Sequence, residues 1–213
     1  MKARIHLKAF LVLAGALFLL FCPVSSNADT ITYYMDQPSG SMPAGMYGTV
    51  TVDLISATQA IITMTAANPP TIELGDGATL ALNPTGAWSV DSYTAGLTPA
   101  GSGKVDGIGY FRLIFDDGSG FSHPYESVSV TLDLTSGSWS TASGVLTSTV
   151  PEAPSQHPSL YMAGGHFGIW NGSTYNPTGW VGSGGVAVPE PTTILIFGSG
   201  LVALWGFRRK LRK

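Results

Sequence analysis

The sequence of 213 residues contains one cysteine, Cys22, and it lies in an apolar run near the N-terminus. We expect that run to be removed, which leaves the mature chain without cysteine. A disulfide framework, a catalytic thiol and a cysteine-ligated metal site are then excluded. A lipoprotein interpretation of Cys22 would want small residues directly before it, and Leu20-Phe21 do not fit that pattern.

Positive charge is nearly absent from the middle of the chain. Charged residues make up 11% of the sequence, less than half of the usual fraction. Between residues 29 and 190, Lys104 and Arg112 stand against thirteen acidic residues, a net charge of −11. Such a surface repels phosphate backbones, so we expect no nucleic-acid partner. The other eight basic residues lie in the first eight and the last six positions.

Residues 1–28 have the layout of a signal peptide. A basic stretch precedes thirteen apolar residues, Ala9–Phe21, and Pro23 then ends the run. Thirteen residues are too few to span a bilayer comfortably, but they suit the apolar segment of a signal. We predict cleavage between Ala28 and Asp29, with the Sec translocon and signal peptidase as partners. The alternative is an N-terminal anchor that is not cleaved.

The other end of the chain combines two prolines, an apolar run and a basic tail. Gly-rich residues 182–187 predict a flexible linker, and Pro189-Glu190-Pro191 then precede the apolar residues 192–207. Sixteen helical residues reach ~24 Å, against ~30 Å of hydrocarbon, so we predict a single short transmembrane helix. The basic residues 208–213 place its end in the cytoplasm and the rest of the chain outside.

This tail resembles the sorting signal of PEP-CTERM proteins, which consists of a Pro-Glu-Pro motif, a transmembrane helix and an Arg-rich end. The corresponding domain here is 188–213, with Pro189, Glu190 and Pro191 as the processing motif. The resemblance implies a Gram-negative host, anchoring in the inner membrane, processing by an exosortase, and delivery to the cell surface or the extracellular space. The alternative is an ordinary C-terminal anchor.

The passenger, residues 29–181, has an apolar period of two and no helical pattern. Val50, Val52 and Leu54 alternate with polar residues, which is typical of a strand with one buried face. We predict an all-β fold, a β-sandwich or jelly roll, with a hairpin of Tyr47–Ile55 and Ala60–Ala66. Further expected strands are Ile31–Tyr34, Thr79–Leu82, Ala87–Val90, Ile108–Phe115, Val128–Leu134, Gly144–Thr147, Leu160–Ala163 and His166–Trp170.

Glycine and aspartate cluster at several points and predict turns. Asp116 and Asp117 are followed by Gly118-Ser119-Gly120. Clustered carboxylates and carbonyls suit calcium, although the alternating spacing of an EF-hand loop is absent. The other interpretation is a hairpin turn in which aspartate and glycine supply the required backbone angles. Gly75–Gly77 and Asn171-Gly172 predict two more turns.

The segment from Trp170 to Trp180 mixes aromatic side chains with amides and hydroxyls. Trp170, Asn171, Tyr175 and Trp180 could stack on sugar rings and bond their hydroxyl groups. This predicts a lectin-like, glycan-binding face. The alternative is that the tryptophans pack as core or edge residues while the polar residues form turns.

No catalytic pattern stands out in the passenger. Its histidines, His123, His157 and His166, have no metal-ligand spacing, and neither a Gly-x-Ser-x-Gly elbow nor a phosphate loop is present. We therefore expect no enzyme activity, no cofactor and no metal. The sequence favours a structural or adhesive surface or matrix protein of an exopolysaccharide biofilm, with extracellular polysaccharide as partner. A carbohydrate-binding module and a secreted hydrolase are the alternatives.

Overall fold

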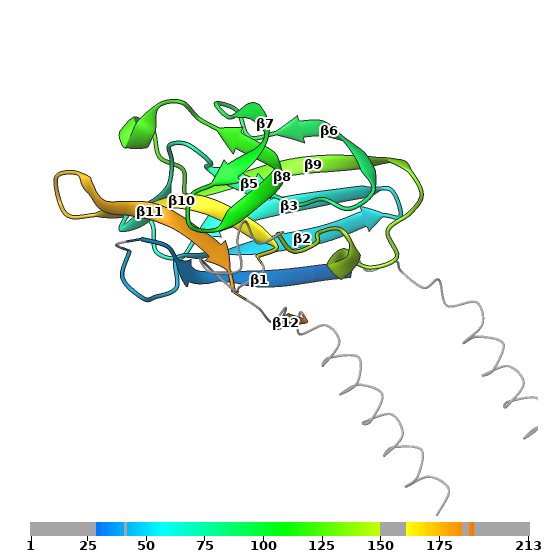
Figure 1. Ribbon diagram of the computed structural model, residues 1–213, viewed down its shortest axis with the longest axis horizontal. Coiled ribbons are helices and arrows are strands. Elements are labelled where there is room, and N and C mark those ends of the chain that lie inside the picture. The colour runs from blue at the N-terminus through cyan, green and yellow to red at the C-terminus, as the bar shows by residue number, and fades with distance from the viewer. Residues whose placement is uncertain (1–28, 41, 150–160, 185–187, 190–213) are drawn as a thin grey trace, which may run out of the picture.

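The computed structural model describes residues 29–40, 42–149, 161–184 and 188–189, and these residues form an all-β domain (Figure 1). Two 3-10 turns, η1 and η2, connect strands. The elements are β1 Asp29–Pro38, β2 Gly48–Ser56, β3 Gln59–Ala66, β4 Ile72–Leu74, β5 Leu80–Leu82, β6 Ala87–Tyr93, β7 Thr98–Val105, β8 Gly109–Asp116, η1 Gly120–Ser122, β9 Ser127–Ser136, η2 Ala142–Gly144, β10 Ala163–Trp170, β11 Tyr175–Ser183 and β12 Val188–Pro189. The predicted all-β class is confirmed.

The β2–β3 hairpin forms as its alternating sequence predicts. Val50 and Val52 are fully buried while the residues between them are only partly covered, and Val50 pairs with Met64 of β3. Successive strand side chains point to opposite faces, so one apolar residue in two suffices to give the hairpin a core face. β9 continues the pattern beside β3, where Val128, Val130 and Leu132 are buried.

The strands form one continuous sheet in the order β6-β9-β3-β2-β1-β11-β10-β5-β8-β7, with β4 beside β10 and β12 beside β1. The sheet is curled like a half-barrel, so that the ring of Tyr93 of β6 packs against that of Phe115 of β8, with centroids 5.2 Å apart and the rings tilted by 45°. This corrects the prediction of two separate sheets in a sandwich or jelly roll. β1 joins the two halves, since its first part pairs with β2 and its last part with β11.

The main core lies inside this curl. Phe167 of β10, Phe115 of β8 and Met64 of β3 are fully buried in one cluster that draws on both halves of the sheet. The packing is close: a Cβ added at Gly165 would lie 2.6 Å from the sulfur of Met64. A smaller cluster around Phe111 and Ile108 covers the opposite face of the sheet near β8. This second cluster supports the site described below.

Two predicted strands are wrong, and four strands were not predicted. Gly144 is the last residue of η2, and the rest of the predicted strand 144–147 contributes only an isolated bridge from Leu146, while β10 begins at Ala163 and leaves out Tyr161 and Met162. The strands that were missed are β4, β7, β11 and β12. β7 and β11 contain proline and several glycines, which local propensity assigns to turns. Pairing with β8 and β10 outweighs that preference.

The predicted linker begins too early. β11 continues to Ser183, which is fully buried and whose hydroxyl accepts hydrogen bonds from the backbone N–H groups of Met162 and Ala163. Gly184 donates a further backbone bond to Tyr34. Residues 182–184 are therefore held by the sheet, because these bonds satisfy buried backbone donors that a mobile linker would leave unpaired.

The described residues contain no helix long and apolar enough to span a membrane. The predicted signal peptide (1–28) and transmembrane helix (192–207) lie outside the described residues. β1 begins at Asp29, the residue that follows the predicted cleavage point, and the carboxylate of Asp29 accepts a 2.6 Å hydrogen bond from the backbone N–H of Ala142. The cleavage itself stays a prediction.

Candidate functional site

The outer face of β10 carries every second residue of that strand. Phe167 points into the main core, so His166, Gly168 and Trp170 lie on the opposite face. Gly168 leaves room there for a ring from another segment: an added Cβ would lie 2.7 Å from Cε1 of Phe121 and 2.9 Å from Cβ of Tyr175. Phe121 belongs to η1, between β8 and β9, and its ring fills the space beside Gly168, between His166 and Tyr175.

Five rings follow one another across this face, which we call the aromatic row: Trp170, Tyr175, Phe121, His166 and Trp180. Centroid distances are 5.1 Å between Trp170 and Tyr175 and 5.1 Å between Tyr175 and Phe121. Phe121 meets His166 edge-on at 5.3 Å, and His166 stacks on Trp180 at 4.2 Å with only 3° between the ring planes. These spacings are within the range of favourable aromatic pairs.

The hairpin between β10 and β11 exposes one end of the row. Trp170 pairs with Tyr175 across the hairpin and is 38% exposed. Asn171 forms the turn: its Oδ1 accepts hydrogen bonds from the backbone N–H groups of Ser173 and Thr174. The amide of Asn171 is thus engaged in the turn, whereas the indole of Trp170 lies open at the tip.

Tyr175 is fixed by a carboxylate beneath the hairpin. Its hydroxyl donates to Oε2 of Glu73, a buried residue of β4. Burial raises the pKa of Glu73 above its ordinary value, and the nearby carboxylate of Glu126 raises it further. The hydrogen bond holds the tyrosine ring against Phe121, so the middle of the row is rigid.

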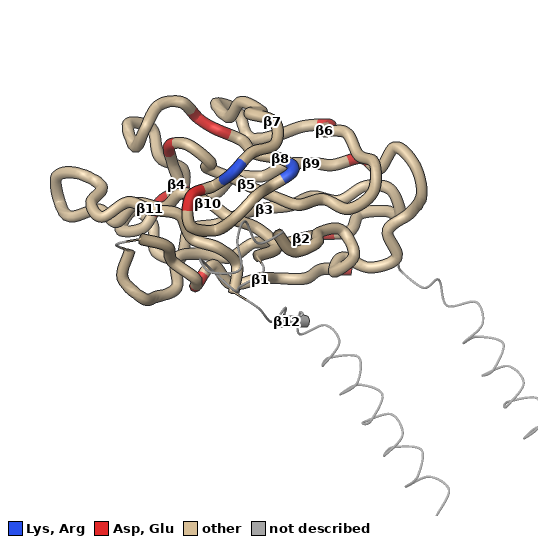
Figure 2. The backbone as a smooth tube through the Cα atoms, in the orientation of Figure 1, with Lys and Arg blue, Asp and Glu red and all other residues tan. Residues whose placement is uncertain are grey.

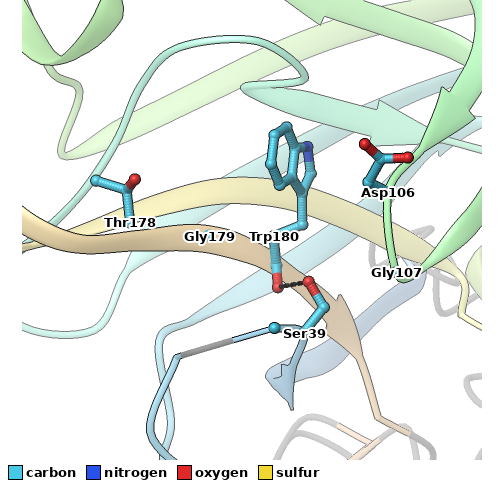
Figure 3. A pocket seen from close by; sticks show the side chains of 7 residues that line it. Ser39, Asp106, Gly107, Thr178, Gly179 and Trp180 are labelled. Atoms are coloured by element: carbon cyan, nitrogen blue, oxygen red, sulfur yellow. Dashed lines mark hydrogen bonds between the residues drawn. The ribbon is translucent and has the colours of Figure 1, made fainter.

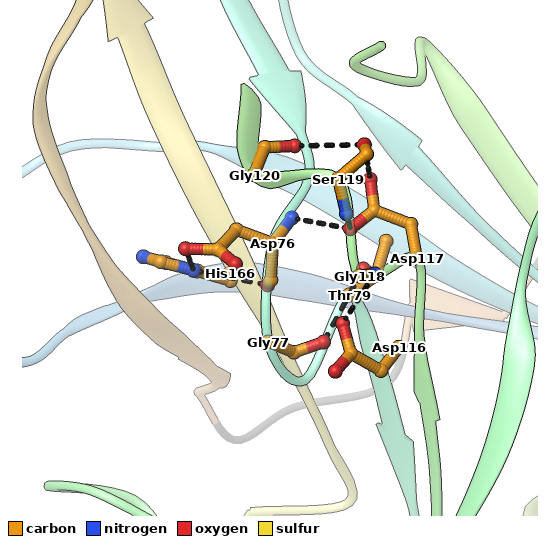
Figure 4. Close-up of polar contacts among 9 residues, drawn as sticks. All are labelled: Asp76, Gly77, Thr79, Asp116, Asp117, Gly118, Ser119, Gly120 and His166. Carbon is orange, nitrogen blue, oxygen red and sulfur yellow. Dashed lines mark hydrogen bonds and ion pairs between the residues drawn. The ribbon is translucent and has the colours of Figure 1, made fainter. Parts of the chain in front are cut away.

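The loop of residues 75–79 wraps around His166 (Figure 4). Gly75 donates to the carbonyl oxygen of His166, and the N–H of His166 donates to the carbonyl oxygen of Ala78. Imidazole Nδ1 lies 3.0 Å from the carbonyl oxygen of Asp76, so it carries the hydrogen and donates. Burial lowers the pKa of His166, although the carbonyl and carboxylate of Asp76 oppose that shift. The histidine therefore anchors the loop through both its backbone and its ring.

The predicted calcium residues, Asp116 and Asp117, hold backbone turns. Asp116 accepts a hydrogen bond from the N–H of Gly118, and Asp117 accepts from the N–H groups of Asp76 and Ser119 (Figure 4). Within the described part of the chain, no group of three or more His, Cys, Asp or Glu side chains could hold a metal ion. The turn is no hairpin, because β8 and β9 are not neighbours in the sheet.

A pocket lies at the buried end of the row, beside Trp180 (Figure 3). Its volume is about 290 Å³. The residues that line it come from β11, from the two residues after β1 and from the β7–β8 turn: Ser39, Gly40, Asp106, Gly107, Thr178, Gly179 and Trp180. The pocket thus combines one large aromatic ring with a carboxylate and two hydroxyl groups.

The two basic residues of the domain are already engaged (Figure 2). Arg112 donates to the carbonyl oxygens of Pro84 and Gly86, and its guanidinium lies 5.9 Å from the ring centroid of Trp88. Lys104 lies 3.6 Å from Oδ1 of Asp106. Every other charged side chain of the described residues is acidic, so the pocket and the row lie on a negatively charged surface.

The structure brings three of the four predicted glycan-binding residues into one row. Trp170, Tyr175 and Trp180 share the outer face, while Asn171 serves the turn. The sequence did not single out Phe121 and His166 for this site. The alternation His166-Gly168-Trp170 along one strand was the available signal for the histidine. No local sequence pattern indicates Phe121, which lies in a loop far from β10 and β11 in the sequence.

The start of the sorting motif is paired with the first strand of the domain. β12 lies antiparallel to β1, with Thr32 opposite Val188 and Ile31 opposite Pro189. It follows β11 along the same side of β1, so the chain leaves the sheet next to the place where β1 begins. Glu190 and Pro191, the other two residues of the predicted processing motif, lie outside the described residues.

Comparison with known proteins gives one match. Residues 187–210 match the family model described as the PEP-CTERM protein-sorting motif, a range that includes Pro189, Glu190 and Pro191. No curated protein and no solved structure matches the chain.

Proposed function

We propose that this chain, which carries a PEP-CTERM protein-sorting motif, is a non-enzymatic adhesive protein of the cell surface or extracellular matrix that binds polysaccharide through its aromatic row. The motif marks the chain as an exported protein that an exosortase processes. Anchoring in the membrane precedes delivery to the surface. The adhesive role and its polysaccharide ligand, within an exopolysaccharide biofilm, are our proposal.

The aromatic row is the observation that carries this proposal. Trp170 is 38% exposed at the hairpin tip, and Tyr175 and Phe121 continue the row toward Trp180. Sugar rings have apolar C–H faces, and a rigid aromatic surface binds them at little cost in conformational entropy. The rings are held by the Tyr175–Glu73 hydrogen bond and by the loop around His166, so the surface is formed before a ligand arrives.

His166 and Asp117, two titratable residues beside the row, have structural partners, which supports a binding role over a hydrolytic one. Nδ1 of His166 donates to a backbone carbonyl, and Asp117 accepts from the backbone of Asp76. A general base must be within reach of a substrate proton, whereas these groups close turns. We therefore take the secreted hydrolase as the weaker alternative.

Substitution of Trp170 tests the proposal. The full chain in mild detergent is screened on a glycan array, and Trp170→Ala is compared with Tyr110→Ala, an exposed aromatic (48%) outside the row and the pocket. We expect Trp170→Ala to weaken glycan binding at least tenfold, about 1.4 kcal/mol, because exposed tryptophans often dominate such contacts. Tyr110→Ala leaves binding unchanged. Absence of glycan binding by the unaltered protein, or equal binding by both variants, would contradict the proposal.

A further inference from the structure

We infer that the pocket beside Trp180 is a subsite for one sugar residue without acidic groups, so that the ligand is a neutral rather than an acidic polysaccharide. The inference rests on the proposed function and specifies its ligand. It depends on the position of Trp180, on the polar groups around the pocket and on the charge of the surrounding surface.

The indole of Trp180 forms part of the pocket wall and is held in place by its neighbours. His166 of β10 stacks on the indole at 4.2 Å, and the indole also packs against the smaller cluster around Phe111 and Ile108. Ser39, which follows β1, contributes to the pocket wall and donates a hydrogen bond to the backbone carbonyl oxygen of Trp180 (Figure 3). A sugar ring in the pocket would therefore lie against a tryptophan that is already held in position from behind.

The groups around this ring suit hydroxyl recognition. The side chain of Asp106 is 81% exposed, and its carboxylate accepts hydrogen bonds only. Thr178 is exposed on β11 and offers a donor and an acceptor. The hydroxyl of Ser39 donates 2.9 Å to the carbonyl oxygen of Trp180, which leaves its oxygen lone pairs for a ligand donor. The pocket thus offers several acceptors and one hydroxyl donor, which suit the hydroxyl groups of a sugar because each of these both donates and accepts.

The size of the pocket limits what it holds. Its volume of about 290 Å³ is at the low end of the ~300–1,000 Å³ usual for small-molecule sites. One sugar residue fits this space better than an oligosaccharide does. The rest of a polymer would extend over the aromatic row toward Trp170.

The surrounding charge excludes acidic sugars. A bound uronate, sulfate or phosphate needs a cation, yet Lys104 is paired with Asp106 and Arg112 is bound to backbone carbonyls. The carboxylates of Asp76, Asp116 and Asp117 lie on the loops beside His166. An acidic polymer on this face would meet like charges without compensation.

Matched polymers test the inference. The probes are dextran, β-1,3-glucan and galactomannan, each in native and in carboxymethylated form, and affinity electrophoresis of the full chain in mild detergent measures binding. We expect at least one native polymer to bind at least tenfold more tightly than its carboxymethylated form. Equal or tighter binding of the carboxymethylated form overturns the inference and leaves the proposed function standing. Failure of every polymer and of the glycan array overturns both.

A pair of charge-matched variants tests the pocket itself. Asp106→Ala removes an exposed carboxylate of the pocket, and Asp91→Ala removes an exposed carboxylate of the distant strand β6. We expect Asp106→Ala to weaken binding of the neutral polymer about tenfold, as loss of a charged hydrogen-bond acceptor does, while Asp91→Ala has no effect. Binding that depends on Trp170 but is unchanged in Asp106→Ala would place the ligand outside the pocket.

Discussion

At the scale of single residues, a glycine and a histidine determine whether the aromatic row can form. Gly168 gives Phe121 the space to lie between its neighbours. His166 holds the loop of residues 75–79 with its backbone and its imidazole, and it also supports Trp180. Both residues act by placing the rings around them, and substitution of each gives a testable prediction.

Gly168→Ala should destabilise the domain and weaken glycan binding. The new Cβ would lie 2.7 Å from Phe121 and 2.9 Å from Tyr175, so at least one of these rings must move. Overpacking of this kind costs about 1–3 kcal/mol. Gly45→Ala is the control, since its Cβ would meet nothing closer than 4.0 Å. Urea unfolding measures both variants, and equal stabilities would show that the rings are not packed as described.

Protonation of His166 should destabilise the fold. Its pKa is lowered in the folded state, mainly by burial, so the unfolded chain binds the proton more readily. The stabilisation is therefore present above the ordinary histidine pKa of about 6.5 and is lost as the pH falls from there toward the folded pKa. We expect His166→Phe, which keeps a ring but cannot titrate, to reduce this loss as the pH falls below about 6.5.

His123 supplies the control for this experiment. It is exposed on the loop after η1, and His123→Phe removes one histidine without touching the loop around His166. Chemical unfolding at a series of pH values gives the free energy for each protein. If the free energy of unfolding has the same pH dependence in the unaltered protein and in His166→Phe, His166 does not contribute to that dependence.

At the scale of secondary-structure elements, β1 connects the fold to the sorting signal. It pairs with β2, with β11 and with β12, so it joins the two halves of the sheet and also holds the first residues of the tail. The short strand β12 contains Pro189, the first residue of the processing motif. The position of the motif is therefore tied to the folded passenger.

Processing should depend on the Pro-Glu-Pro motif. The prolines favour an extended backbone ahead of the apolar run, where a membrane-embedded enzyme can reach it, and Glu190 offers a charge for recognition. Replacement of Pro189, Glu190 and Pro191 by alanine should retain the full-length protein in the membrane. Mass spectrometry of the C-terminus, in a host with its exosortase, measures this. The same C-terminus at Lys213 in both proteins would indicate an ordinary anchor.

Cross-linking β12 to β1 should slow that processing. Thr32 and Val188 are partners in the antiparallel register, so Thr32→Cys with Val188→Cys allows a disulfide between them. The disulfide prevents β12 from leaving the sheet to enter the enzyme. We expect cleavage to be slower when the pair is oxidised and to recover after reduction, whereas either single variant is processed normally. Equal cleavage of the oxidised and reduced forms would show that β12 stays on β1 during processing.

At the scale of the whole molecule, the negative charge lies between residues 29 and 190, while most of the positive charge lies at the two ends of the chain. Between residues 29 and 190 the net charge is −11, and the structure shows that Lys104 and Arg112 have partners of their own. The processed protein should therefore bind neither DNA nor anionic vesicles at physiological salt. Co-sedimentation with vesicles and gel shift with DNA measure this. Salt-sensitive binding to either would contradict the charge distribution described here.

Features that depend on local composition could be derived from the sequence alone. Export and sorting signals are contiguous segments, so the tail from Pro189 was identifiable without a structure and is matched by the sorting-motif family model. The all-β class followed in the same way from the alternation of Val50, Val52 and Leu54, because strand side chains alternate between two faces. The β2–β3 hairpin was predictable since its two strands are neighbours in sequence.

Contacts between segments far apart in the sequence are visible only in the folded chain. Phe121 reaches the row across almost fifty residues from Trp170, and no local pattern marks such a contact. The single curled sheet depends on β1 changing partners from β2 to β11 at Met35, where the register shifts. Proline and glycine in β11 predicted turns and a linker, yet pairing on both sides makes it a central strand. Backbone hydrogen bonds to neighbouring strands and burial of the core outweigh local preference at these places, and only the folded chain contains them.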